Sequence, residues 1–238
     1  MTYADLFSST FRLAQLSVRI VLHRKFLFAG LGVVVYYGIL YAILVFRPSD
    51  GFSVEEALRI LVQIPGAVLA IYLSMDLVAS ERDGDTLETL FSASASHYVV
   101  WLIRIGCLHV VLALTVMSMS TVSYFLFAEH PFVLGGLNAL ISTLFVANLT
   151  FLFAVSVRNS NSAGMLALGA LIVSLITQGS TDGTVYSLFL NPFEPPTGVD
   201  LSLWADTVLI NRGLVVVGSA VTLYLALSKM GRRDRWLN

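Results

Sequence analysis

Charged side chains are scarce in this chain of 238 residues, since only 12% are Asp, Glu, Lys or Arg and 57% are hydrophobic. A soluble globular domain carries roughly 25% charged residues. The deficit argues against an ordinary soluble domain and predicts an integral membrane protein. The net charge of -1 at pH 7 also gives no support for nucleic-acid binding through a basic surface.

Cysteine is nearly absent as well. The single cysteine, Cys107, has no second cysteine with which to form a disulfide within the chain, and it lies in an apolar run. It is expected to be a packed residue of the membrane core.

Signatures of nucleotide, metal and nucleophile chemistry are also missing. The sequence has no glycine-rich phosphate loop followed by Lys-Ser/Thr, so the chain is not expected to bind and hydrolyse ATP itself. It has no His-Glu-x-x-His, Cys-x-x-Cys or Gly-x-Ser-x-Gly pattern, which removes the commonest zinc, redox and serine-hydrolase functions. Neither enzymatic activity nor a resident cofactor is predicted, and any energy must come from another subunit.

Long uncharged stretches are the dominant feature that is present. A hydrocarbon core of about 30 Å needs about 20 apolar residues in a helix. The stretches predict one transmembrane domain over 1–238, all α-helical, with six spans at about 26–46, 58–79, 99–128, 132–157, 160–179 and 208–229. Residues 1–25 combine arginines and phenylalanines at helical spacing, which predicts an amphipathic helix in the membrane interface.

The basic residues predict the orientation. With the amino terminus inside, eleven of the fourteen Lys and Arg residues fall on the cytoplasmic side, and Arg47, Arg59 and Arg212 fall outside or near that boundary. We therefore expect a multi-pass protein of the cell (inner or plasma) membrane with both termini in the cytoplasm. The longest external segment, 178–207, is expected to be extracytoplasmic or re-entrant, with a short interfacial or re-entrant helix at Tyr186 to Leu190.

Polar residues inside the predicted spans have two interpretations. They could line a translocation path, or they could form hydrogen bonds between helices. His109, in the third span, is expected to be a neutral, hydrogen-bonded structural residue rather than a ligand, because no second histidine stands beside it. The path candidates are Gln63, Asn138, Ser142 and Asn148.

Small residues recur at helical spacing in the last two spans. Ala163, Ala167 and Ala170 share one face of the fifth span, and Gly218 and Ala226 share one face of the sixth. Such faces allow close helix contact in lipid, either within one subunit or across a dimer. In the second span, Pro65 and Gly66 are expected to kink the helix or to admit another backbone.

The densest charged patch, 81–96, follows the second span. Asp85 is a candidate N-cap and Glu88, three residues later, supports the first turn of a short helix. Leu87, Leu90 and Phe91 would share one face of this helix. An apolar face on a short cytoplasmic helix indicates that another protein docks there.

The patch reads Glu81-Arg82-Asp83-Gly84-Asp85-Thr86-Leu87-Glu88-Thr89-Leu90, and it resembles the segment E-x-x-x-G-T-L-E-x-L of ABC-2-type transporter permeases. In that family the segment also follows the second membrane helix and supplies the coupling helix that touches the ATPase subunit. The sequence departs from the pattern at Asp85, where the family usually has glycine, and at Ser94, which replaces a common proline.

The resemblance implies a type V-like exporter fold and a dimer of permease subunits, homomeric or heteromeric, driven by separate ATP-binding cassette ATPase subunits that hold ATP and magnesium. It also implies a set of residues that couple the membrane domain to the ATPase: Glu81, Thr86, Leu87, Glu88, Leu90 and Phe91.

Three other functions remain open at this stage. The haem-exporter permease of cytochrome c maturation has a similar D-G-S-L-E-Q-L stretch after its second span. An intramembrane enzyme would need convergent polar groups at membrane depth. A structural membrane scaffold would have no ATPase partner.

Overall fold

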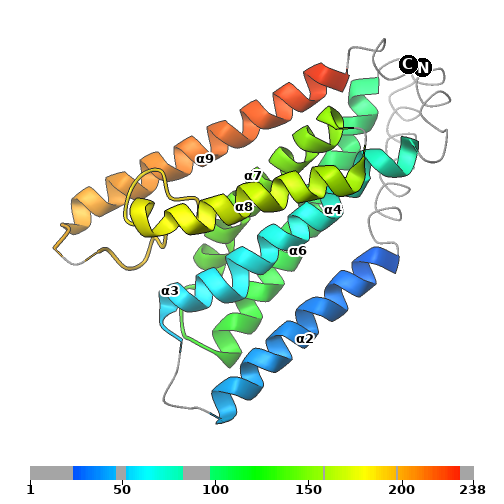
Figure 1. The fold of residues 1–238 in the computed structure, drawn as a ribbon. Helices are drawn as coiled ribbons and strands as arrows, with labels where there is room; N and C mark the ends of the chain where they lie inside the picture. Colours follow the sequence, from blue (N-terminus) through cyan, green and yellow to red (C-terminus); the bar gives the residue numbers. More distant parts are fainter. Residues whose placement is uncertain (1–23, 47–51, 83–96, 158, 197, 231–238) are drawn as a thin grey trace, which may run out of the picture.

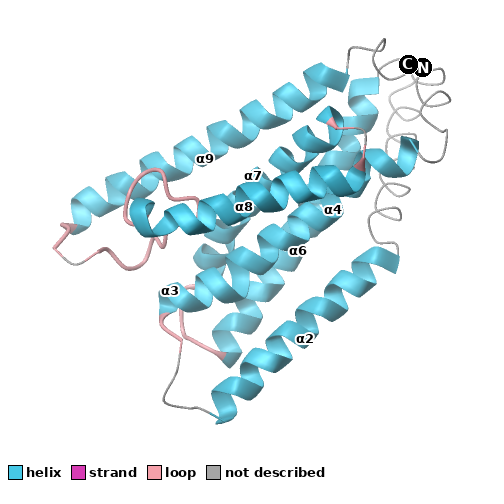
Figure 2. Cartoon of the chain, in the orientation of Figure 1, coloured by secondary structure: helices cyan, strands magenta, loops and turns pink. Residues whose placement is uncertain are grey.

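The computed structural model describes residues 24–46, 52–82, 97–157, 159–196 and 198–230, and within these ranges it contains helices and no strand (Figures 1 and 2). The helices are α2 (Arg24–Phe46), α3 (Val54–Glu56), the π-helix η2 (Ala57–Gln63), α4 (Ile64–Arg82), α6 (His97–Leu126), α7 (Phe132–Ser156), α8 (Ser160–Thr181) and α9 (Leu201–Met230).

The prediction of six spans is confirmed at the level of length and composition. In the described part of the chain, six helices are long and apolar enough to cross a membrane, with α3, η2 and α4 forming one continuous span. Because the number of crossings is even, the start of α2 and the end of α9 lie at the same end of the bundle (Figure 1). The predicted interfacial helix, 1–25, lies almost wholly outside the described residues.

Two apolar helices begin earlier than the predicted spans. The last span begins at Leu201 rather than at residue 208, and the second begins at Val54 rather than at residue 58. Counting uncharged stretches excluded the start of each helix because acidic residues stand there, Glu55 and Glu56 in the second span and Asp206 in the last. Ser53 starts the second span with a capping box, in which its hydroxyl accepts from the Glu56 amide at 3.2 Å and its own amide donates to the Glu56 carboxylate at 3.0 Å.

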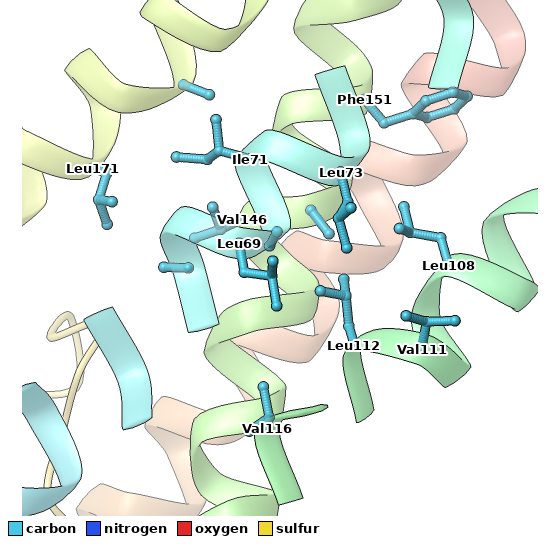
Figure 3. Packing of buried hydrophobic residues seen from close by; sticks show 14 of the residues in the cluster. Leu69, Ile71, Leu73, Leu108, Val111, Leu112, Val116, Val146, Phe151 and Leu171 are labelled. Atoms are coloured by element: carbon cyan, nitrogen blue, oxygen red, sulfur yellow. The ribbon is translucent and has the colours of Figure 1, made fainter. Parts of the chain in front are cut away.

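Helix α7 is the centre of the bundle, since it contacts α4, α6, α8 and α9. Buried side chains from four helices meet around it, including Leu69 of α4, Leu112 of α6, Phe151 of α7 and Leu171 of α8 (Figure 3). Helix α2 lies at the edge and contacts α4 (Figure 1).

The π-helix and Pro65 explain how α2 is attached. Pro65 has no backbone N–H, so it cannot donate to the carbonyl of Leu61 in an α-helix or of Ile60 in a π-helix. Two neighbouring tyrosines of α2 supply the missing donors: Tyr36 Oη donates to Ile60 O at 2.9 Å, and Tyr37 Oη donates to Leu61 O. Side chains of the first span therefore donate to backbone carbonyls that the irregular helix of the second span leaves without a backbone donor.

Small residues serve packing within the subunit. A Cβ on Gly66 would lie 2.9 Å from Thr143 Oγ1 and 3.2 Å from Val116 Cγ2, so α4 approaches α6 and α7 at a distance that only glycine permits. Ala163 and Ala167 of α8 are buried in the same chain, and a Cβ on Gly218 of α9 would lie 3.2 Å from Phe145. These faces are occupied without a second copy.

Candidate functional site

The middle of the loop between α8 and α9, which spans residues 182–200, is buried by its own chain. Ser187, Phe189, Leu190 and Asn191 are each less than a tenth exposed. The described residues of this loop form turns and no helix, so the helix expected at Tyr186 to Leu190 is wrong.

The α8–α9 loop lies alongside the membrane-spanning helices rather than beyond their ends. Its contacts on α7 are at Asn138 and Ser142, which at 1.5 Å per residue stand about 9 and 15 Å into that helix. Non-helical backbone at such a depth is tolerated only where protein buries it or where it lines a cavity. Here the protein itself buries the backbone of the middle of the loop.

Two side chains of α7 donate hydrogen bonds to carbonyls of this loop. Asn138 Nδ2 donates to Leu190 O at 3.2 Å, and Ser142 Oγ donates to Leu188 O at 2.7 Å. Asn138 is 6% exposed and Ser142 is fully buried. Both donors therefore replace the water that these carbonyls would otherwise need.

Two consecutive residues of α9 complete the arrangement from the opposite side. Asn211 Nδ2 donates to Val185 O at 2.8 Å and to Ser187 O at 2.7 Å. Arg212 donates from Nη2 to Leu190 O at 2.6 Å and from Nη1 to Ser142 Oγ at 3.3 Å. We call the four side chains Asn138, Ser142, Asn211 and Arg212 the loop clasp.

Arg212 is a cation inside a membrane-spanning helix, and among the described residues it forms no ion pair. An intramembrane charge is costly unless polar groups surround it. Here the Leu190 carbonyl and the Ser142 hydroxyl supply the negative ends of their dipoles. The two terminal nitrogens of Arg212 thus find acceptors in the loop and on α7, whereas its Nε is buried without a hydrogen-bond partner among the described residues.

A cavity of about 320 Å³ lies beneath the α8–α9 loop, between α7, α8 and α9. The loop contributes Val185, Tyr186 and Leu188 to its wall, and α8 contributes Ala167, Ala170 and Ser174. The lining is mostly apolar, so the cavity suits hydrocarbon groups better than ions.

A second polar cluster lies nearer the middle of the bundle. Asn148 Nδ2 donates to Ser219 Oγ at 2.9 Å, and Asn148 Oδ1 is 3.0 Å from His109 Nε2. An amide oxygen can only accept, so His109 Nε2 carries a proton and donates to Asn148. His109 is thus hydrogen-bonded between helices, as predicted.

Replacing Asn148 by leucine is expected to lower the free energy of unfolding by about 1 kcal/mol, the size of interhelical hydrogen bonds measured in membrane proteins. The change removes the partners of His109 and Ser219 together. Unfolding in detergent and SDS mixtures measures it. Asn161→Leu, at an exposed position of α8, is the control and should change stability little.

The predicted path candidates are scattered rather than gathered along one lumen. Asn138 and Ser142 belong to the loop clasp, whereas Asn148 bonds His109 and Ser219. Gln63, in η2, is 1% exposed and its Nε2 has no hydrogen-bond partner in the described part of the chain. Within the described residues, Asn138, Ser142 and Asn148 form hydrogen bonds between helices or to the loop inside one subunit.

The predicted coupling residues cannot be placed in the same way. Thr86, Leu87, Glu88, Leu90 and Phe91 lie outside the described residues, and Glu81 lies in the last turn of α4, where only the backbone is described. No group of three or more His, Cys, Asp or Glu residues that could hold a metal ion occurs among the described residues.

The sequence interpretation missed Asn211 and Arg212. It placed Arg212 outside or near the membrane boundary because it started the last span at residue 208. The available signal was an Asn-Arg pair within an apolar run, since an ionisable residue in a membrane helix is a functional candidate by default.

A scan against protein-family models finds no match, and a search of curated proteins finds no significant match. Functional inference therefore depends on the residues themselves.

Proposed function

We propose that this protein is the membrane-spanning permease subunit of an ATP-binding cassette exporter of the ABC-2 type. It works as a dimer that forms the translocation path and is driven by separate ATPase subunits. The observation that carries the proposal is the sequence Thr86-Leu87-Glu88 with Leu90, placed directly after the second of six spans.

The arrangement of the helices supports this assignment. The end of α4 and the start of α6 flank the coupling segment, and both lie at the end of the bundle where α2 begins and α9 ends (Figure 1). Basic residues cluster in the sequence at this end, which makes it the cytoplasmic one by the positive-inside rule. An ATPase in the cytoplasm would meet the coupling segment there.

The loop clasp gives the end of the bundle opposite the coupling segment a part in the proposed transport mechanism. The α8–α9 loop covers the cavity between α7, α8 and α9, and Arg212 links it to the central helix through Ser142. Rigid helices transmit a shift from one end of a bundle to the other. ATP-driven displacement of α4 would reach the loop through α7, which contacts both α4 and α9.

The assignment is tested by replacing Glu88 with lysine. The motif glutamate would face the ATPase, so reversing its charge is expected to reduce the co-purified nucleotide-binding subunit about tenfold at an equal level of inserted permease. Asp83→Lys makes the same charge change in the same segment, at a position that the family motif leaves free, and is expected to retain the ATPase.

Purification of the wild-type chain from native membranes gives the reference amount of ATPase. An intramembrane enzyme or a scaffold would bring down no nucleotide-binding subunit at all, and that result would reject the proposal. Equal loss of the ATPase from both lysine variants would reject the role of Glu88.

A further inference from the structure

A groove of about 470 Å³ separates α2 from α4. Its lining is apolar or aromatic throughout, with Phe28, Val33 and Tyr36 on α2 facing Val68, Leu69 and Tyr72 on α4. The two helices run antiparallel, so Phe28 and Tyr72 mark the end of the groove nearer the start of α2. Tyr36 and Ile64 mark the other end.

Hydrogen bonds close the groove at the end nearer the middle of α2, and among the described residues none closes its other end. Tyr36 and Tyr37 attach α2 to η2 through their hydrogen bonds to Ile60 and Leu61. In the described part of the chain, no hydrogen bond joins α2 to α4 along the groove itself. The walls therefore form an elongated slot, about 12 Å long at 1.5 Å per residue over 28–36.

The position of the slot decides the chemistry of its occupant. It lies between two membrane-spanning helices, where the surrounding solvent is hydrocarbon, and it offers no charged or amide group. Dispersion contact with an extended methylene chain is the interaction that such a wall can make. One turn before Phe28, at the open end, α2 begins with the basic residues Arg24 and Lys25.

We propose that the α2–α4 groove binds one acyl chain of an anionic glycerophospholipid, with the headgroup phosphate at the basic start of α2. The closed end stops the chain at Tyr36, and the basic end selects an anionic headgroup. The proposal is independent of the ABC exporter assignment.

Gly32 makes the proposal testable, because it lines the groove and a Cβ placed on it meets nothing within 4 Å. The Cβ of Gly32→Leu therefore meets no clash, and the rest of the leucine side chain is expected to occupy the slot. Gly30 on the same helix is also open and lies outside the groove, so Gly30→Leu gives the same gain in helix propensity with the slot left empty.

Native mass spectrometry of the detergent-purified chain, after reconstitution in mixed phosphatidylglycerol and phosphatidylethanolamine, provides the measurement. Wild type and Gly30→Leu are expected to retain one phosphatidylglycerol per chain, and Gly32→Leu to retain about tenfold less. The double variant Arg24→Gln with Lys25→Gln is expected to keep a lipid but to lose the preference for phosphatidylglycerol.

Two results would overturn the proposal. In the first, Gly32→Leu retains as much phosphatidylglycerol as Gly30→Leu, which places the lipid elsewhere. In the second, Gly32→Leu converts a dimer into a monomer while the wild type retains no lipid, which makes a second copy of the chain the occupant. If the double variant Arg24→Gln with Lys25→Gln keeps the preference for phosphatidylglycerol, Arg24 and Lys25 do not bind the headgroup.

Discussion

Replacing Asn211 with leucine is expected to release the α8–α9 loop and to lower the free energy of unfolding by about 3 kcal/mol. Asn211 is fully buried and its amide serves two carbonyls, those of Val185 and Ser187. Leucine fills a similar space but donates nothing, so both carbonyls lose this donor in a place that water cannot easily reach. Each buried acceptor left without a partner costs about 1–3 kcal/mol.

Two measurements separate loop release from general instability. Unfolding in detergent and SDS mixtures gives the free energy. Ser187→Cys, in a Cys107→Ala background, reports the loop through its reaction with a membrane-impermeant maleimide, because Ser187 is 1% exposed in the native structure. Labelling is expected to rise about tenfold when Asn211→Leu is added.

Thr207→Leu is the matched control for Asn211→Leu. Thr207 is a polar residue of the same helix whose hydroxyl bonds only within α9, to Leu203 O at 2.9 Å. It should leave maleimide labelling of Ser187→Cys unchanged. Equal labelling in Asn211→Leu and Thr207→Leu would contradict a clasping role for Asn211.

Gly66→Leu is expected to be the most disruptive change in the core, with a loss of about 3 kcal/mol, at the upper end of the usual cost of overpacking. The added Cβ would lie 2.9 Å from Thr143 Oγ1, and the rest of the side chain would have to enter the contact between α4, α6 and α7. The better helix propensity of leucine offsets only about 1 kcal/mol of this. Unfolding in detergent and SDS mixtures measures this loss in the free energy of unfolding.

Gly106→Leu is the control for propensity alone, since a Cβ on Gly106 of α6 meets nothing within 4 Å, and it is expected to be neutral or stabilising. A double-mutant cycle locates the clash. Thr143→Ala removes the nearest atom, so Gly66→Ala should cost about 1 kcal/mol less in the Thr143→Ala background than alone. Strict additivity of the two alanine changes would show that Thr143 is not the obstacle.

The sequence predicts the number and order of the spans because a hydrocarbon core imposes a length that can be counted. It also predicts that Gly66 admits a neighbouring helix or that Pro65 kinks its own. It does not predict η2, because the carbonyls of Ile60 and Leu61 find their donors on Tyr36 and Tyr37, residues of another helix. Such pairing follows from the packed fold and leaves no local pattern.

The loop clasp shows the same limit at the candidate site. Asn138 and Ser142 are identifiable as polar residues in an apolar run, and the two predicted roles, path lining and hydrogen bonding, could not be separated from sequence. Their partners are backbone carbonyls of Leu190 and Leu188, which every residue type possesses. Sequence identifies a donor inside the membrane, but it does not identify a backbone acceptor.

Synthesis order gives the loop clasp a consequence for assembly. The ribosome delivers α7 first, then the α8–α9 loop, and only afterwards Asn211 and Arg212. Until α9 is inserted, the carbonyls of Val185 and Ser187 lack their Asn211 donor, and of the loop clasp only Asn138 and Ser142 of α7 can hold the loop. Insertion of α9 therefore completes the hydrogen bonding of the loop backbone that α7 begins.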